Sequence, residues 1–146
     1  MARSATILRV AFLVGAVADA LALIPMLVPS VATVLWGIEE RSPAFHFAST
    51  SAAALMLGWT ALLLWAYHRP IERRAVAGLT ILVIVGLAMA EIWAVSSSLI
   101  SVSRIVPIWA LQVVLVALFT AGLVQSRPER ASVGSRLGRA VKSRHR

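Results

Sequence analysis

A long apolar stretch, Ala75–Leu99, constrains the fold of this chain more than any other feature. No charged residue occurs from Ala75 to Ala90. At 1.5 Å per helical residue these positions alone span about 24 Å, which is most of the hydrocarbon core of a bilayer. The stretch therefore predicts a transmembrane helix. Its single carboxylate, Glu91, lies near the far end, where a charge is costly unless it faces protein or water, so Glu91 is the first candidate for function.

The composition favours lipid as the solvent of this chain. The hydrophobic content is 60% and the mean hydropathy is +0.87, both above those of an ordinary soluble domain. The formal charge is +8, but half of the basic residues follow Gln125 and the others flank apolar segments. This placement favours contact with membrane surfaces over nucleic-acid binding, for which the sequence contains no recognised motif.

Cysteine and histidine usage excludes several kinds of site. The chain has no cysteine, so it forms no disulfide and no thiolate metal site. The three histidines, His46, His68 and His145, are too far apart in the sequence to predict a metal cluster. No cofactor motif is present, and no cofactor is expected.

Four apolar segments are long enough to cross a bilayer as helices. They cover residues 10–28, 45–67, 75–99 and 108–124. A cleaved signal peptide is the competing interpretation of the first segment, because a basic start, an apolar run and alanines around Asp19 resemble a cleavage region. The main prediction is an all-α integral membrane protein. It consists of an antiparallel four-helix bundle over residues 1–125 and a polybasic cytoplasmic tail over residues 126–146.

The connections between these spans are predicted to be short. Pro29–Ile38 is apolar but too short to cross a bilayer, so it predicts an interfacial or re-entrant segment anchored by Trp36. Residues 96–98 and 101–107 predict a connection that contains Arg104. In the turn between the second and third spans, Glu72 is expected to form an exposed ion pair with a neighbouring arginine.

The basic residues predict the orientation of the bundle. Twelve of them lie at the termini or in the turn at residues 69–74, against only Arg41 and Arg104 on the other side. The positive-inside rule therefore places both termini and this turn in the cytoplasm, as in a multi-pass protein of the inner (plasma) membrane. Seven of the twelve are in the tail, where they are expected to contact anionic lipid headgroups. These seven are Arg127, Arg130, Arg136, Arg139, Lys142, Arg144 and Arg146.

Five polar residues of the predicted spans are expected at related depths. Counting from the cytoplasmic boundary puts Glu91 in the outer third of the bilayer and Asp19 near its midplane. We therefore hypothesise that the five line a cavity that opens outward between the helices, with Trp93 as a further wall. They are Asp19, His46, Thr50, Glu91 and Gln112.

The two isolated acids allow more than one interpretation. Because no lysine or arginine lies inside a span, each acid is expected to be protonated, hydrated, hydrogen-bonded to a neighbour such as Gln112, or balanced by a bound cation. The structural alternative is a carboxyl group that only holds helices together. Small residues at four-residue spacing also predict close helix packing. The pairs are Gly15 with Asp19, Ala54 with Gly58, and Gly86 with Ala90.

The middle of the chain resembles a known group of proteins. The segments LMLGWT from Leu55, RPIERR from Arg69 and AEIWA from Ala90 are similar to those of an uncharacterised family of small bacterial four-span integral membrane proteins. The resemblance covers Leu55–Ala94. It implies the four-span architecture and no catalytic residue.

Three functions are compatible with these features. The main interpretation is a non-enzymatic membrane protein that binds a small amphipathic ligand or a protein partner through the polar pocket. One alternative is a proton-coupled exporter of cationic or lipophilic compounds that uses Glu91 and Asp19, although the characteristic first-span sequence of small multidrug exporters is absent. The other is a lipid-modifying enzyme in which Glu91 acts with Asp19 or His46 as an acid–base pair. Candidate partners are the bilayer itself, a second copy of the chain and another membrane protein.

Overall fold

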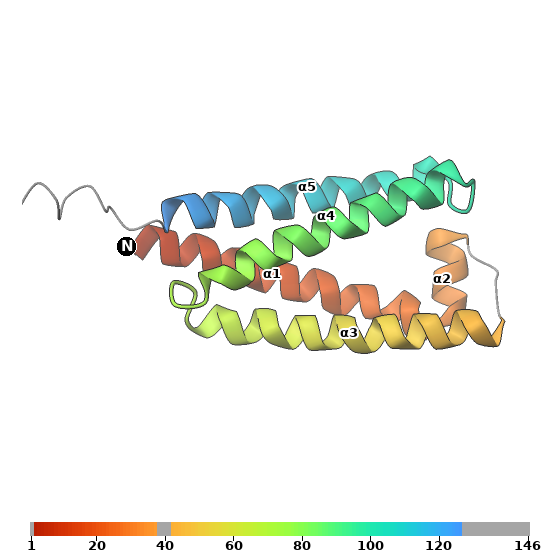
Figure 1. The fold of residues 1–146 in the computed structure, drawn as a ribbon, viewed down its shortest axis with the longest axis horizontal. Helices are drawn as coiled ribbons and strands as arrows, with labels where there is room; N and C mark the ends of the chain where they lie inside the picture. Colours follow the sequence, from red (N-terminus) through yellow and green to blue (C-terminus); the bar gives the residue numbers. More distant parts are fainter. Residues whose placement is uncertain (1, 38–41, 127–146) are drawn as a thin grey trace, which may run out of the picture.

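Five helices make up the described part of the chain, which covers residues 2–37 and 42–126 of a computed structural model. Four long helices lie along the long axis of the molecule, and one short helix lies across one end (Figure 1). The described residues contain no strand. The helices are α1 (Ala2–Leu27), α2 (Pro29–Trp36), α3 (Pro43–His68), α4 (Arg74–Ser96) and α5 (Val102–Gln125).

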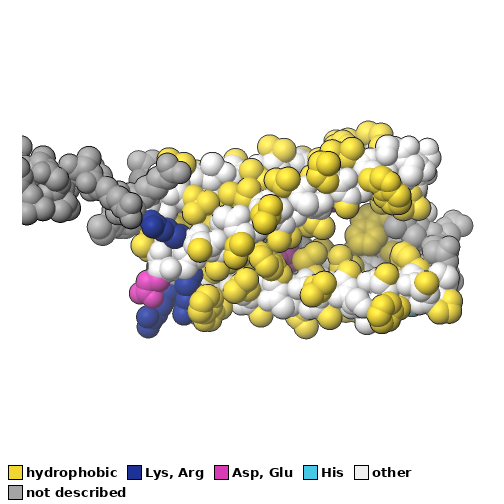
Figure 2. Space-filling view, viewed as in Figure 1, with side chains coloured by type: hydrophobic (Ala, Val, Ile, Leu, Met, Phe, Trp, Pro, Cys, Tyr) yellow, Lys and Arg dark blue, Asp and Glu magenta, His cyan; other side chains and the backbone are white. Residues whose placement is uncertain are grey.

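All four long helices are long and apolar enough to cross a membrane. The described surface agrees with this, because large apolar side chains such as Leu55, Phe47 and Val113 are largely exposed. Apolar side chains cover most of the face shown in Figure 2, whereas the charged side chains visible there gather mainly at one end. An apolar surface of this extent is unfavourable in water and is typical of helices that face lipid.

Three helix boundaries differ clearly from the predicted ones. α1 begins at Ala2, eight residues before the predicted start of the first span. α4 ends at Ser96 rather than at Leu99, because Ser98 adopts a positive φ of 60° and the Ser97 hydroxyl donates to the Ala94 carbonyl. α5 begins at Val102, so residues predicted as a connection form its first turns and Pro107 lies inside it. Tertiary contacts hold this extra length, since Ile105 is almost fully buried.

The core of the bundle is built around α1, which packs along both α3 and α5. Its residues Leu8 and Phe12 are fully buried, as are Leu63 of α3 and Phe119 of α5. The rings of Phe12 and Phe119 lie 5.6 Å apart between centroids in a tilted arrangement. α4 packs mainly on α5, and it makes few contacts with α3. α3 and α4 therefore diverge from the turn that joins them (Figure 1).

Only one of the three predicted small-residue pairs lies at a close helix contact. A Cβ atom added at Gly15 would lie 3.3 Å from both Leu63 and Phe119. At Gly58 and Gly86 it would meet nothing within 4 Å, so these two glycines do not bring helices together. The closest approach occurs instead at Gly122 of α5, where an added Cβ would lie 2.6 Å from Leu8 Cδ2.

The short helix α2 is fixed across one end of the bundle. Arg104 at the start of α5 donates from Nη1 to the carbonyls of Thr33 and Val34, both at 3.1 Å. Gly37 ends α2 with a φ of 73°, and its N–H donates to the Thr33 carbonyl. Because a cation is favourable beside the carbonyls at a helix C-terminus, Arg104 holds this end of α2 in place. Ile38, the last residue of the predicted interfacial segment, lies outside the described residues.

Candidate ligand-binding cavity

A cavity of about 430 Å³ lies between the four long helices. Its floor consists of buried residues, including Gly15 on α1, Leu63 on α3 and Phe119 on α5. Its rim consists of exposed residues of the diverging helices, including Leu55 on α3 and Leu87 on α4. Figure 2 shows a hollow between these two helices with an acidic side chain visible inside it. Such a cavity has the size and the apolar walls of a small-molecule site.

Asp19 is the only ionisable side chain among the residues that line this cavity. It is partly buried, and it makes no hydrogen bond or ion pair with any described residue. Of the other polar groups in the lining, the Thr80 hydroxyl donates to the Val76 carbonyl of its own helix at 2.8 Å, and the buried indole N–H of Trp59 makes no hydrogen bond among the described residues. A carboxyl group in such surroundings is costly unless a proton, water or a bound cation compensates it.

Glu91 has a different environment from Asp19. Gln112 of α5 donates from Nε2 to both carboxylate oxygens of Glu91, at 2.9 and 3.0 Å. The indole of Trp109 lies near the same carboxylate, although its buried N–H makes no hydrogen bond within the described part of the chain. The pair therefore links α4 to α5, and neither of its members lines the cavity that contains Asp19. Of the alternatives left open for Glu91, the hydrogen bond with Gln112 is the one that is present.

The other predicted site residues belong neither to the Asp19 cavity nor to the Glu91–Gln112 pair. His46 and Thr50 are exposed on α3, and Trp93 is 67% exposed on α4. None of the three lines the Asp19 cavity. Gln112 instead borders a shallower groove of about 900 Å³ between α4 and α5. The five polar residues predicted to share one cavity are thus distributed over several surfaces, because similar depth in a bilayer does not put two residues on the same face of a helix.

The residues that line the cavity recur with the period of a helix. This pattern is present in the sequence, but the depth of residues in the bilayer, from which the site was predicted, does not show it. The lining positions on α4 are spaced by three and four residues, and those on α3 have the same spacing. Met56 and Trp59 are among the wall residues that the sequence interpretation missed. The α4 positions are Thr80, Val83, Ile84 and Leu87, and the α3 positions are Ala52, Leu55, Met56, Trp59 and Leu63.

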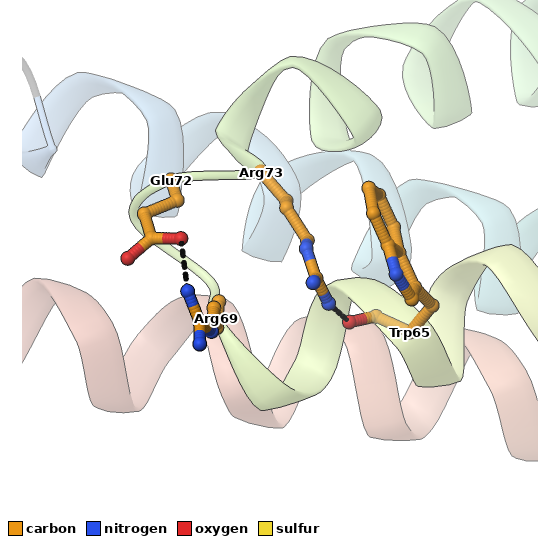
Figure 3. Close-up of polar contacts among 4 residues, drawn as sticks. All are labelled: Trp65, Arg69, Glu72 and Arg73. Carbon is orange, nitrogen blue, oxygen red and sulfur yellow. Dashed lines mark hydrogen bonds and ion pairs between the residues drawn. The ribbon is translucent and has the colours of Figure 1, made fainter.

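The basic turn between α3 and α4 is held by local contacts (Figure 3). Arg69 and Glu72 form the predicted ion pair at 3.2 Å, and both side chains are exposed, so the pair contributes little to stability. The guanidinium of Arg73 lies 3.5 Å above the ring of Trp65 and also donates to the Trp65 carbonyl. Arg74 donates to the Ser126 carbonyl at 2.8 Å, which brings the end of α5 beside this turn.

The predicted lipid-contact residues of the tail follow Ser126 and lie outside the described residues. Their names are Arg127, Arg130, Arg136, Arg139, Lys142, Arg144 and Arg146.

The Glu91–Gln112 contact is expected to stabilise the bundle modestly. Replacing Gln112 with leucine should lower the free energy of unfolding by about 1 kcal/mol, because interhelical hydrogen bonds in membranes are worth about 0.6 to 1.7 kcal/mol. The measurement is denaturant unfolding in mixed micelles, as a double-mutant cycle with Glu91→Leu, since a glutamine at position 91 would keep an oxygen that accepts from Gln112. A coupling energy near zero between the two positions would show that the hydrogen bond adds nothing to stability.

The resemblance of Leu55–Ala94 to a family of small four-span membrane proteins stays a prediction after comparison with known proteins. No protein-family model, curated protein or solved structure matches the chain.

Proposed function

We propose that this chain is a non-enzymatic membrane protein that binds a small amphipathic ligand with one positive charge in the Asp19 cavity. One observation carries the proposal: a cavity between all four long helices contains a single ionisable group, and that group has no partner among the described residues. The apolar walls fit the body of such a ligand, and the carboxylate of Asp19 fits its cation. The rings of Trp59 and Phe119 also line the cavity, and aromatic faces attract cations.

We further propose that the four long helices form an antiparallel bundle in the inner membrane, with both ends in the cytoplasm. The positions of the charges support this. Arg69, Arg73 and Arg74 lie at the same end as Ser126, after which the basic tail begins. In Figure 2 the visible arginine side chains gather at this end. Basic residues next to a span are attracted to anionic headgroups, so the tail is proposed to bind them.

The test uses two probes of equal shape. Phenyltrimethylammonium carries one positive charge, and tert-butylbenzene is its neutral isostere. Calorimetric titration of the full chain in phospholipid nanodiscs should show tighter binding of the cation. Asp19→Asn should weaken the binding of the cation at least tenfold, about 1.4 kcal/mol, because it removes the negative charge that attracts the quaternary ammonium, which has no N–H to donate. Binding of the neutral probe should change little.

Glu91→Gln is the matched control for this experiment, since it removes the other intramembrane acid but does not alter the cavity lining. It should leave the affinity for the cation unchanged. Equal affinities for wild type and Asp19→Asn would contradict the proposal, and so would a loss of binding confined to Glu91→Gln.

The proton-coupled exporter is the second candidate, and the unpartnered Asp19 carboxyl favours it. Such a group can hold either a proton or a cation, and exchange between the two is what coupling requires. The same titration in two buffers of different ionisation enthalpy counts the protons released for each cation bound. Release of one proton, lost in Asp19→Asn, would support export, and no release would reject it.

A further inference from the structure

The Asp19 cavity borders the gap between α3 and α4, because residues of both helices line it and these two helices make few contacts with each other. The residues on its floor are buried, with Leu63 and Phe119 both fully so. The rim residues are not: Leu55 on α3 is 78% exposed and Leu87 on α4 is 39% exposed. Because α3 and α4 make few contacts, no packed interface separates the cavity from the surroundings along this gap.

The gap lies at the middle of the spans. Leu87 follows Arg74, the first residue of α4, by 13 positions, and Leu55 follows Pro43, the first residue of α3, by 12. At 1.5 Å per residue the two leucines are therefore about 20 and 18 Å along their helices. In a hydrocarbon core about 30 Å thick, both positions face acyl chains rather than water or headgroups.

Packed or hydrogen-bonded segments lie at both ends of the bundle. At one end α3 and α4 converge on their basic turn (Figure 1), where Ala66 and Ala77 are completely buried. At the other end α2 lies across the bundle, and Arg104 binds its last carbonyls. A hydrogen bond of 2.6 Å from the Ser49 hydroxyl to the Met26 carbonyl also ties α3 to the end of α1 there.

We infer that the ligand enters the Asp19 cavity sideways from the bilayer interior, through the gap between Leu55 and Leu87. This inference rests on the proposed function and adds a requirement to it. The ligand must first dissolve in the membrane, so lipid-soluble monocations should be taken up in preference to water-soluble ions of the same charge. The cavity volume of about 430 Å³ limits this class to small amphiphiles and excludes whole phospholipids.

The test measures how fast a cation enters the cavity. A styrylpyridinium dye is a lipophilic monocation whose visible emission is separate from tryptophan fluorescence. Its binding to the full chain in phosphatidylcholine nanodiscs is followed by stopped flow. Leu87→Trp and, independently, Leu55→Trp put a larger side chain on the rim and should each slow the association at least fivefold. Slower association should be accompanied by slower dissociation, because both pass through the same gap.

Matched controls use exposed leucines of the same two helices that do not line the cavity. Leu82→Trp on α4 and Leu57→Trp on α3 should leave the association rate unchanged. Arg104→Gln loosens α2 and should also leave the rate unchanged. Tetramethylammonium, which is equally charged but poorly soluble in lipid, should compete only weakly with the dye.

The outcomes separate the entry route from the proposed function. If neither rim variant slows association while Asp19→Asn still weakens binding, entry through the gap is wrong and the binding function stands. If Arg104→Gln accelerates association several-fold, the ligand enters past α2 instead. If wild type and Asp19→Asn bind the dye with the same affinity, or if neither binds it, the proposed function itself is wrong.

Discussion

Replacement of Phe119 with alanine is expected to lower the free energy of unfolding by about 3 to 5 kcal/mol, the usual range for a buried phenylalanine. Phe119 is completely buried where α5 meets α1. Its ring contacts that of Phe12, with centroids 5.6 Å apart, and an added Cβ at Gly15 would lie 3.3 Å from it. The truncation therefore removes contacts between α5 and α1 and leaves a space that joins the Asp19 cavity.

Unfolding in mixed detergent micelles, followed by tryptophan fluorescence, measures this change. The matched control is Phe47→Ala, since Phe47 is 76% exposed on α3. The control should shift the free energy of unfolding by less than about 0.5 kcal/mol, as expected for a surface substitution. Equal shifts for the two variants would show that Phe119 is not packed in a core.

Replacement of Gly122 with valine is expected to lower the free energy of unfolding by about 2 to 3 kcal/mol. The added Cβ would lie 2.6 Å from Leu8 Cδ2 and 2.9 Å from Leu8 Cγ, both inside contact distance. Leu8 is fully buried, so it has no free space into which its side chain can move. α1 and α5 must separate instead, which is the usual cost of overpacking a core.

Two further variants make the Gly122 prediction specific. Gly86→Val on α4 adds the same atoms at a position with nothing within 4 Å, and it should leave stability almost unchanged. Leu8→Ala removes the atoms that clash, so the double variant should be less unstable than the sum of the two single variants. Strict additivity of the two changes would place the close helix contact elsewhere.

The helical architecture follows from the sequence because lipid leaves the backbone few choices. Within a bilayer, backbone N–H and C=O groups must pair inside the protein, so long apolar segments form helices. The apolar segments predicted four such helices, and four are present in the described residues. The boundaries were predicted less well where tertiary contacts act. Arg104 and Ile105 extend α5 by their contacts, and no local pattern around them signals this.

For the candidate site too, one part could be predicted from the sequence and another part depends on helix packing. Residue types identified Asp19 and Glu91 as the unusual groups, since intramembrane carboxylates are costly wherever they lie. Their roles depend on helix rotation and packing, which a count of residues along the bilayer normal does not contain. Helix rotation places Glu91 beside the amide of Gln112, whereas Asp19 lies in a cavity and has no hydrogen-bond partner among the described residues.

The sequence by itself was enough to predict a lipid environment, the helical secondary structure and the two unusual acids, Asp19 and Glu91. Each of these depends on residue type and on the length of an apolar run. Only the tertiary structure decided which faces meet. The tertiary structure packs α1 against α3 and α5, and it leaves α3 and α4 largely apart. As a result Glu91 takes part in a contact between two helices, whereas Asp19 is the ionisable residue that lines a cavity. These outcomes depend on side-chain packing between segments far apart in the chain.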